Sequence, residues 1–263
     1  MSYILEFFFE IYKIPVLVLF IYMNIAFIIA TLRKDNSVAD IAWGLGFIVA
    51  GYTAFLLQPT VTVHDYLSLT LVTLWGLRLA GQIYLRNRGK DEDFRYKEMR
   101  EKWGDKALLY SYFKVFMLQG LLLLVIASPL LLIQSTSEAT FGILDGLAVL
   151  IWSVGFAFEA ISDWQLYNFT QDKKNKGKLL TTGLWKYSRH PNYFGEVTQW
   201  WAIFLLAIGH PYSGLAIIGP AVITYSILKV SGIPLLEEKM EGKKGFKKYK
   251  KETSIFIPRP PKK

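Results

Sequence analysis

Long apolar runs alternate with short polar or charged segments along almost the whole chain. A membrane-spanning helix needs about 20 mostly apolar residues, so each long run is a candidate span. The runs occupy residues 14–32, 38–57, 66–85, 112–133, 141–161, 197–208 and 213–230. The pattern predicts an all-α protein, a polytopic membrane helix bundle with about seven transmembrane helices. The sixth run is short, and Pro191 favours a start inside the polar stretch before it.

The basic residues lie almost entirely in alternate connections. Of the 30 Lys and Arg residues, 27 fall in segments 33–37, 86–111, 162–196 and 229–263. Cytoplasmic loops of membrane proteins carry the excess of Lys and Arg. The distribution therefore predicts an N-out, C-in orientation for a single integral-membrane domain, residues 1–263, with a basic cytoplasmic tail at 235–263. Six spans with a re-entrant pair at the end would put this tail on the wrong side.

Composition supports the same class of protein. The chain has 52% hydrophobic residues, a formal net charge of +9 and no cysteine. This composition excludes a disulfide framework and thiolate metal sites. The positive charge follows one side of the predicted membrane, so nucleic-acid binding is not indicated. Three histidines, His64, His190 and His210, are too scattered for a metal site, and we expect none.

The longer polar segments allow more than one interpretation. Residues 1–13 lack a basic start and a cleavage site, and read as an interfacial segment rather than a signal peptide. Residues 86–111 form an amphipathic helical stretch, which either lies on the membrane surface or is a solvated helix. Residues 168–178 read as a polar loop. The basic tail can bind anionic lipid head groups, or simply keep the protein soluble.

The densest group of chemically distinct side chains lies between Gly183 and Glu196, immediately before the sixth apolar run. The stretch has the sequence Gly183-Leu-Trp-Lys-Tyr-Ser-Arg-His-Pro-Asn-Tyr-Phe-Gly-Glu196. An interfacial belt of aromatic and basic residues is the simpler explanation. Such belts, however, rarely need His, Pro and Asn together. We therefore interpret residues 183–196, the polar motif, as a candidate functional site.

Ionisable residues inside or at the edges of spans point to function or to internal pairing. Asp40 and Arg78 either pair with each other across two helices or face a substrate cavity. Glu159 and Asp163 are four residues apart on one helical face, so they require cations or ligand hydroxyls nearby. With the polar motif, these groups offer cations for phosphates, carboxylates for ribose hydroxyls and aromatic faces for stacking. No Rossmann glycine pattern or P-loop is present, and there is no nucleophile elbow of a serine hydrolase.

Six segments carry a resemblance to a known family. They are Asp40-Ile-Ala-Trp-Gly, Leu74-Trp-Gly-Leu-Arg-Leu, Arg88-Gly-Lys-Asp-Glu-Asp-Phe-Arg-Tyr96, Ser162-Asp-Trp-Gln, Leu184–Glu196 within the polar motif, and Glu237-Glu-Lys-Met. The chain resembles the bacterial branch of the steroid 5-alpha-reductase family, also catalogued as the DUF1295 family. Sterol C14-reductases and isoprenylcysteine carboxyl methyltransferases have similar Arg-His motifs. The resemblance therefore implies one of two cofactors, NADPH or S-adenosylmethionine.

The reductase is favoured because the resemblance extends over seven spans and includes the segment at Arg95 and Tyr96. NADPH also has three phosphates to match the basic loops, whereas S-adenosylmethionine has none. The resemblance implies a cofactor site facing the cytoplasm, in a bacterial inner membrane. Its expected cofactor-binding residues are Asp163, Arg189, His190, Asn192, Tyr193, Glu196, Arg95, Tyr96, Glu237 and Glu238.

Family reductases use an acid and a tyrosine to polarise an enone carbonyl while hydride reaches the beta carbon. By this resemblance Asp40 is the candidate acid, provided that burial keeps it protonated. Tyr84 is the candidate tyrosine, with Tyr52 as an alternative. The implied activity is an NADPH-dependent reduction of a C=C bond in a lipophilic substrate, such as a steroid, isoprenoid or fatty-acyl enone. The alternative is an S-adenosylmethionine-dependent membrane methyltransferase. Expected partners are a substrate from the bilayer and membrane lipids.

Overall fold

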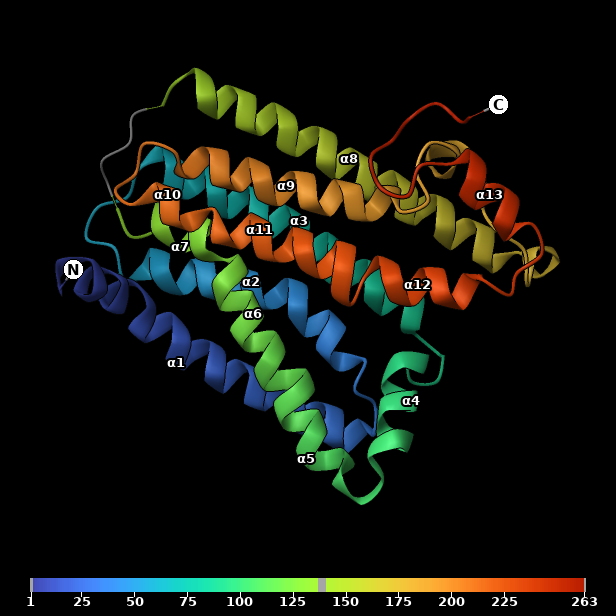
Figure 1. Ribbon diagram of the computed structural model, residues 1–263. Helices are drawn as coiled ribbons and strands as arrows, with labels where there is room; N and C mark the ends of the chain where they lie inside the picture. The colour runs from blue at the N-terminus through green and yellow to red at the C-terminus, as the bar shows by residue number, and fades with distance from the viewer. Residues whose placement is uncertain (1, 137–140, 263) are drawn as a thin grey trace. The chain divides into compact units, whose positions relative to one another are not determined.

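The computed structural model describes residues 2–136 and 141–262, and all the regular elements in these ranges are helical. The chain divides into two compact units, which are described separately. Unit 1 comprises residues 1–141 and 206–219, and unit 2 comprises residues 142–205 and 220–263. The fold is thus all-α, as predicted, and Figure 1 labels its helices.

Unit 1 is built on three long helices followed by a broken one. The long helices are α1 (Ser2–Arg33), α2 (Val38–Leu56) and α3 (Val63–Asn87). The broken stretch consists of α4 (Phe94–Trp103), η1 (Gly104–Lys106), α5 (Ala107–Ser111), the π-helical η2 (Tyr112–Met117), α6 (Leu118–Ile126) and α7 (Ser128–Ile133). The short α10 (Ser213–Ala216) completes the unit.

Glycines bring α2 and α3 into close contact. A Cβ atom on Gly44 would lie 2.8 Å from the Gly76 carbonyl oxygen, and one on Gly76 would lie 2.5 Å from that of Gly44. Only glycine permits this backbone approach. Phe47 and Trp75 pack beside the crossing with ring centroids 5.3 Å apart. The crossing fixes the position of the first turn of α2, which carries Asp40.

The charged helix α4 is held against the turn between α1 and α2. The Asn36 backbone N–H donates to Glu92 at 2.8 Å, and the Asp93 N–H donates to the Ser37 hydroxyl at 2.8 Å. Gly104 ends α4 with a φ of 51°, a left-handed conformation that favours glycine. The chain therefore changes direction before the apolar stretch that follows, and α4 lies beside the ends of α1 and α2 (Figure 1).

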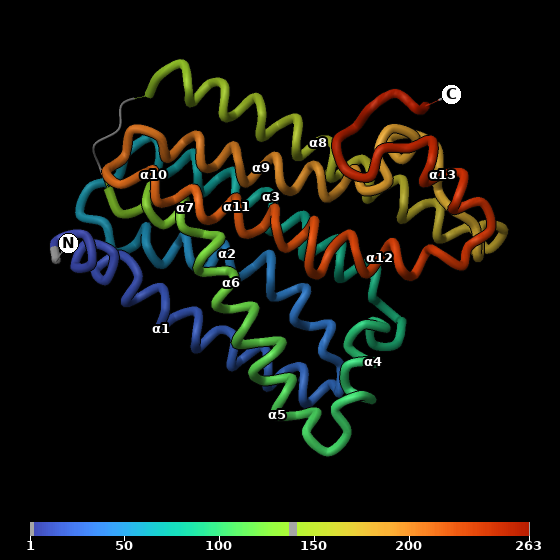
Figure 2. Tube along the Cα trace, viewed as in Figure 1, coloured from blue at the N-terminus to red at the C-terminus, as the bar shows by residue number. Residues whose placement is uncertain are grey.

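Unit 2 is built around α8 (Ile143–Gln171) and most of α9 (Pro191–Ala207). Two 3-10 turns, η3 (Lys173–Asn175) and η4 (Gly183–Lys186), lie in the connection between them. The chain continues through α11 (Ile218–Tyr225), the π-helical η5 (Ser226–Val230), α12 (Ile233–Met240) and α13 (Phe246–Glu252). Figure 2 follows the trace from α12 through α13 to the C-terminus.

A second pair of glycines sets the packing of α8 against α9. A Cβ atom on Gly195 would lie 2.4 Å from the Gly155 carbonyl oxygen and 2.6 Å from the Glu159 backbone nitrogen. A Cβ atom on Gly155 would likewise lie 2.8 Å from the Gly195 carbonyl oxygen. The end of the polar motif therefore contacts the part of α8 that carries its carboxylates.

Replacement of Gly195 by alanine tests this crossing. Because the new methyl group would meet backbone atoms, which cannot rotate away, we expect a loss of about 1–3 kcal/mol in the free energy of unfolding. Gly146→Ala is the matched control, since a Cβ atom there meets nothing within 4 Å. That substitution should be neutral or stabilise α8 by up to roughly 1 kcal/mol. Thermal unfolding in detergent compares the two variants, and equal effects would contradict the close crossing.

Five helical stretches are long and apolar enough to cross a membrane: Tyr3–Arg33, Val38–Leu56, Phe94–Ile126, Ile143–Gln171 and Ser213–Met240. A helix is present at each of the seven predicted segments, which confirms the all-α class. The helices α3 and α9 are not among the five, so seven spans and the N-out, C-in orientation stay predictions. Gly104 interrupts the third stretch, so its membrane-crossing part begins beyond that residue.

One predicted segment is continuous with its neighbour, and one predicted boundary was wrong. Residues 2–13 continue into the first span as part of α1, and Pro15 lies inside this helix. An interior proline has no N–H to donate, so the Ile11 carbonyl lacks its usual helical partner there. The helix α8 continues through residues 162–171, although 168–171 was expected to be loop. Contacts from the polar motif to Ser162 and Gln165 support this polar extension.

Candidate functional site

The start of the polar motif is fastened to α8. Gly183 adopts a φ of 63°, which allows the backbone to turn against the side chain of Gln165. Gln165 Oε1 then accepts a hydrogen bond from the Leu184 N–H at 3.0 Å, and the Trp185 indole donates to the Ser162 carbonyl at 3.1 Å. Pro191 begins α9, a position where its missing N–H costs nothing. Residues 188–190 are thus held between the hydrogen bonds to α8 on one side and the start of α9 on the other.

Arg189 lies at the centre of unit 2 and is buried, with 4% of its surface exposed. Its Nε and Nη2 atoms donate to both oxygens of Glu237, at 2.9 and 2.8 Å. Its Nη1 atom donates to the backbone carbonyls of Lys250 and Thr253, at 3.1 and 2.7 Å. This forked geometry matches a carboxylate well. Arg189 therefore binds the C-terminal segment, whereas the sequence suggested a cofactor phosphate.

His190 belongs to the same buried arrangement. Its Nε2 atom lies 3.0 Å from Glu237 Oε1, and its ring stacks on Tyr193 with centroids 5.8 Å apart. His190 is 1% exposed, whereas Tyr193 is partly exposed. Glu237 is likewise buried, but the neighbouring Glu238 is exposed. Of the two tail glutamates proposed from the sequence, Glu237 is the one that contacts the motif.

Polar side chains on α8 and α9 face each other beside this arrangement. Asn192 Nδ2 donates to Asp163 Oδ1 at 3.2 Å, and Gln199 Nε2 donates to Glu159 Oε2 at 2.6 Å. The Asn192 Oδ1 atom is buried and accepts no hydrogen bond within the described part of the chain. Glu196 follows Asn192 by four residues and so lies on the same face of α9. The structure thus brings Asn192 to Asp163, and Glu196 lies on the same face of α9 as Asn192.

A separate cluster, the Asp40 cluster, lies in unit 1. Asp40 Oδ2 accepts from Arg95 Nη2 at 2.6 Å, and Asp40 Oδ1 accepts from the Tyr96 hydroxyl at 2.6 Å. The Tyr96 oxygen in turn accepts from Gln119 Nε2 at 3.2 Å. Arg86 lies farther off, at 4.0 Å from Asp40. Asp40 is therefore an ion-paired acceptor here, and its contacts give no support to the neutral carboxylic acid expected from the sequence.

The tyrosine beside Asp40 is Tyr96. The candidates proposed from the sequence, Tyr84 and Tyr52, are 50% and 43% exposed, whereas Tyr96 is 5% exposed. Sequence spacing could not reveal this pairing, because Asp40 and Tyr96 lie 56 residues apart on different helices. The only available signal was the position of Arg95 and Tyr96 within a segment that carried the family resemblance.

Asp93 orients Arg95 toward Asp40. Its Oδ1 atom accepts from the Arg95 backbone N–H at 3.0 Å and from Arg95 Nε at 2.9 Å. Burial alone would raise the pKa of the Asp93 carboxyl, but the hydrogen bonds and positive charge of Arg95 outweigh burial and hold that pKa below its ordinary value. No role for Asp93 was predicted from the sequence, although an acidic residue just before a helix is a common N-cap.

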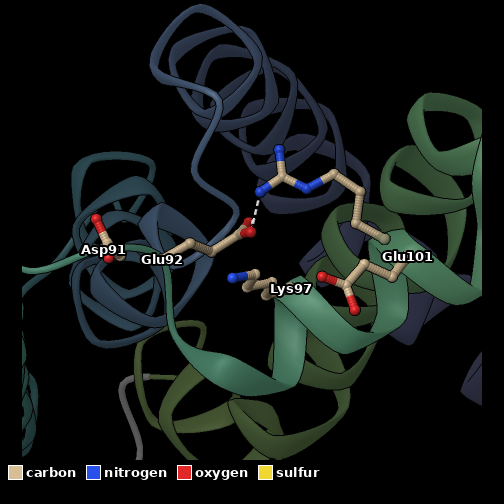
Figure 3. Close-up of a pocket in the computed structure, with 5 residues that line it drawn as sticks. Asp91, Glu92, Lys97 and Glu101 are labelled. Atoms are coloured by element: carbon tan, nitrogen blue, oxygen red, sulfur yellow. Dashed lines mark hydrogen bonds and ion pairs between the residues drawn. The ribbon is translucent and has the colours of Figure 1, made fainter.

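A cavity of about 380 Å³ opens beside the start of α4, lined by Asp91, Glu92, Lys97, Arg100 and Glu101. Figure 3 shows the side chains of Glu92, Lys97 and Glu101 bordering the same hollow. Glu92 is ion-paired with Arg100 and also accepts the Asn36 N–H. All five lining residues thus carry charged groups, and none is an aliphatic or aromatic residue of the kind that lines a pocket for a lipophilic substrate.

The C-terminal segment contributes groups that no sequence motif indicated. The Tyr249 hydroxyl donates to the Trp185 carbonyl at 2.5 Å, and burial raises the pKa of Tyr249. The Ser188 hydroxyl donates to the Phe256 carbonyl at 2.7 Å, and the Arg189 N–H donates to the Ser254 carbonyl at 2.8 Å. Most of the acceptors are backbone carbonyls, which side-chain patterns cannot identify.

Comparisons with known proteins identify the family of the chain and name no activity. A Schizosaccharomyces pombe (strain 972 / ATCC 24843) protein described as "Uncharacterized protein C594.04c" is 25% identical over 289 aligned residues, which cover 94% of this chain and 80% of the relative. No solved structure matches the chain. Residues 26–253, from the second half of α1 to the end of α13, match the family described as "Protein of unknown function (DUF1295)". The chain therefore belongs to the DUF1295 family.

Proposed function

We propose that this protein is an integral-membrane, NADPH-dependent reductase that reduces a C=C bond of a lipophilic, conjugated substrate. The observation that carries the proposal is the buried Asn192 Oδ1 atom, which accepts no hydrogen bond and lies on the side chain that contacts Asp163. A buried acceptor without a partner is costly, so a ligand that donates there gains affinity. The carboxamide and the ribose hydroxyls of NADPH are donors of this kind.

The charges around this pair also fit the cofactor. Five lysines of the α8–α9 connection are exposed, and none forms an ion pair in the described structure: Lys173, Lys174, Lys176, Lys178 and Lys186. We assign the phosphates of NADPH to these lysines, because the guanidinium of Arg189 is already committed to Glu237 and two carbonyls. Tyr193 and its stacked neighbour His190 offer an aromatic face at the same site.

The Asp40 cluster supplies the acid–tyrosine pair that the family resemblance implies. NADPH supplies the hydride when it is bound. We propose that the Tyr96 O–H, which donates to Asp40 here, turns to donate to the carbonyl of a bound substrate, while Gln119 Nε2 holds the Tyr96 oxygen and Asp40 keeps Arg95 in place. Arg95 pairs with Asp40 and adds positive charge where negative charge develops on that oxygen. Burial of Tyr96 excludes water, which strengthens these interactions.

Cofactor-dependent thermal stabilisation of the detergent-purified protein tests the cofactor without a known substrate. A ligand that binds only the folded state stabilises it by about 2.7 kcal/mol at a hundredfold excess over its Kd. We expect NADPH to raise Tm and S-adenosylmethionine to leave it unchanged, with NADH measured for comparison. A rise with S-adenosylmethionine alone would assign the protein to the methyltransferases. No rise with any of the three would overturn the proposal.

The double variant Asn192→Ala, Glu196→Ala locates the binding site. Loss of the unpaired acceptor and of a carboxylate on the same face should weaken NADPH binding at least tenfold, as one or two charge-assisted hydrogen bonds are removed. Asn168→Ala, at an exposed amide near the end of α8, is the matched control and should bind as the wild type does. Unchanged affinity in the double variant would exclude this face of α9 as the cofactor site.

A further inference from the structure

The helix α13 carries a concentrated positive charge on one face. Phe246 and Tyr249 are buried, whereas Lys247, Lys248 and Lys251 are exposed. From residue 241 to the C-terminus the chain has nine basic residues and only two acidic ones, Glu241 and Glu252. These two are paired with Lys250 and Lys248, at 2.5 and 3.9 Å.

Several of these cations have no protein counter-charge. Lys243, Lys244, Lys247 and Lys251 form no ion pair within residues 2–136 and 141–262. Repulsion between neighbouring lysines costs stability unless salt or another anion screens it. The basic face of α13 is thus electrostatically suited to an anionic surface.

The segment is rigidly held, although a charged C-terminal tail is usually mobile. Arg189 donates to the carbonyls of Lys250 and Thr253, and Ser188 and Ser254 form an isolated parallel β-bridge. Farther along, the Arg259 N–H donates to the Tyr187 carbonyl at 3.0 Å. The lysines are therefore presented in a fixed arrangement, and binding would cost little conformational entropy.

After α13 the chain is extended, so successive side chains point to opposite sides, and two large apolar ones are exposed. Phe256 points inward and packs on Phe194 of α9, with ring centroids 5.8 Å apart. Its neighbours Ile255 and Ile257 are 46% and 51% exposed, as expected for residues on the opposite side of an extended chain. Two exposed isoleucines beside a group of lysines are characteristic of a segment that lies in the membrane interface.

The contacts of Phe256 place these isoleucines level with the apolar part of α8. Phe194, which packs on Phe256, also packs on Phe158 at 5.3 Å. Phe158 precedes the end of α8 at Gln171 by about 13 residues, or roughly 20 Å of helix. Trp185, which accepts from Tyr249 of α13, contacts Ser162, one turn nearer that polar end. The apolar and basic residues of the tail thus lie at two successive depths.

We propose that residues 246–262 form an interfacial anchor that binds anionic phospholipids of the leaflet on the side of the basic loops. Ile255 and Ile257 enter the boundary of the hydrocarbon layer, and the lysines of α13 contact lipid phosphates. Each lysine near an anionic surface changes affinity about fivefold, so Lys247, Lys248 and Lys251 together account for a factor on the order of a hundred. This proposal is independent of the cofactor and of the reaction.

The depth of the tail can be measured directly, because the chain has no cysteine. Single-cysteine variants Ile257→Cys and Lys247→Cys would carry an environment-sensitive fluorophore in nanodiscs that contain phosphatidylglycerol. Bromine atoms placed near the head-group end of the acyl chains should quench the label at position 257 strongly and the label at 247 weakly. If aqueous iodide quenches both labels equally and the brominated lipids quench neither, the anchor is excluded.

Lipid specificity is tested on the full-length protein in detergent. Added phosphatidylglycerol should raise Tm by roughly 2–4 °C, and phosphatidylcholine should have a much smaller effect. The variant Lys247→Gln, Lys248→Gln, Lys251→Gln should lose this response. The matched variant Lys97→Gln, Lys102→Gln, in exposed positions of α4, should keep it. Equal stabilisation by glycerol 3-phosphate, or an unchanged response of the triple variant, would overturn the proposal.

Discussion

Replacing Arg189 with methionine is expected to lower the free energy of unfolding by about 3–5 kcal/mol. Removal of one partner from a buried ion pair leaves the other charge uncompensated, and here it also leaves two backbone carbonyls without a donor. The measurement is SDS-titrated or thermal unfolding of the purified protein, with the C-terminal segment probed by limited proteolysis. We expect cleavage after residue 240 to become much faster.

Two further variants separate the buried pair from a general effect of lost charge. Lys13→Met removes a cation that is paired with Glu10 at the exposed surface of α1, and should cost less than about 1 kcal/mol. The double variant Arg189→Met, Glu237→Met removes both buried charges, so it should recover part of the loss seen in Arg189→Met alone. A loss in Arg189→Met no larger than in Lys13→Met would show that the buried pair does not organise the tail.

Asp40→Asn and Tyr96→Phe are expected to reduce turnover by at least a hundredfold and to leave NADPH-induced stabilisation unchanged. A positioned proton donor contributes about 10²–10⁴ to a rate, and this contribution is lost when the hydroxyl or its orienting carboxylate is removed. The assay follows NADPH oxidation with lipophilic steroid, isoprenoid and fatty-acyl enones. Tyr84→Phe is the control, because Tyr84 is half exposed. A loss in Tyr84→Phe with full activity in Tyr96→Phe would restore the assignment made from the sequence.

The helical class and most helix positions follow from the sequence, because apolar runs of about 20 residues permit few other structures in a membrane. The start of α9 at Pro191 is fixed by local chemistry and was predicted correctly. The polar end of α8 was not, because residues 168–178 are polar and show no apolar period. This part of the helix is stabilised by contacts with residues 184 and 185, which lie about 20 positions farther along the chain.

The candidate site was predictable in part, because helical spacing shows which residues share a face. Asp163, Asn192 and Glu196 lie on two helices that a glycine crossing holds together, and spacing along each helix indicated their faces. Pairing between distant charges was not predictable. Asp40 pairs with Arg95, 55 residues away, although Arg78 was the partner considered from the sequence. Many charged residues at helix ends could form such pairs, and the packing of the helices determines which of them do.

The bridge between Ser188 and Ser254 has a consequence for the order of events during synthesis. Arg189 and its acceptor Thr253 are separated by 64 residues, so α9 leaves the ribosome well before the segment that completes it. Until residues 237–253 have been made and have left the ribosome, the guanidinium has neither Glu237 nor the tail carbonyls, and the nascent motif cannot adopt its final geometry. Folding of the motif therefore waits for this later segment, and a ribosome stalled before residue 253 would hold an insertion intermediate whose Arg189 lacks its carbonyl acceptors.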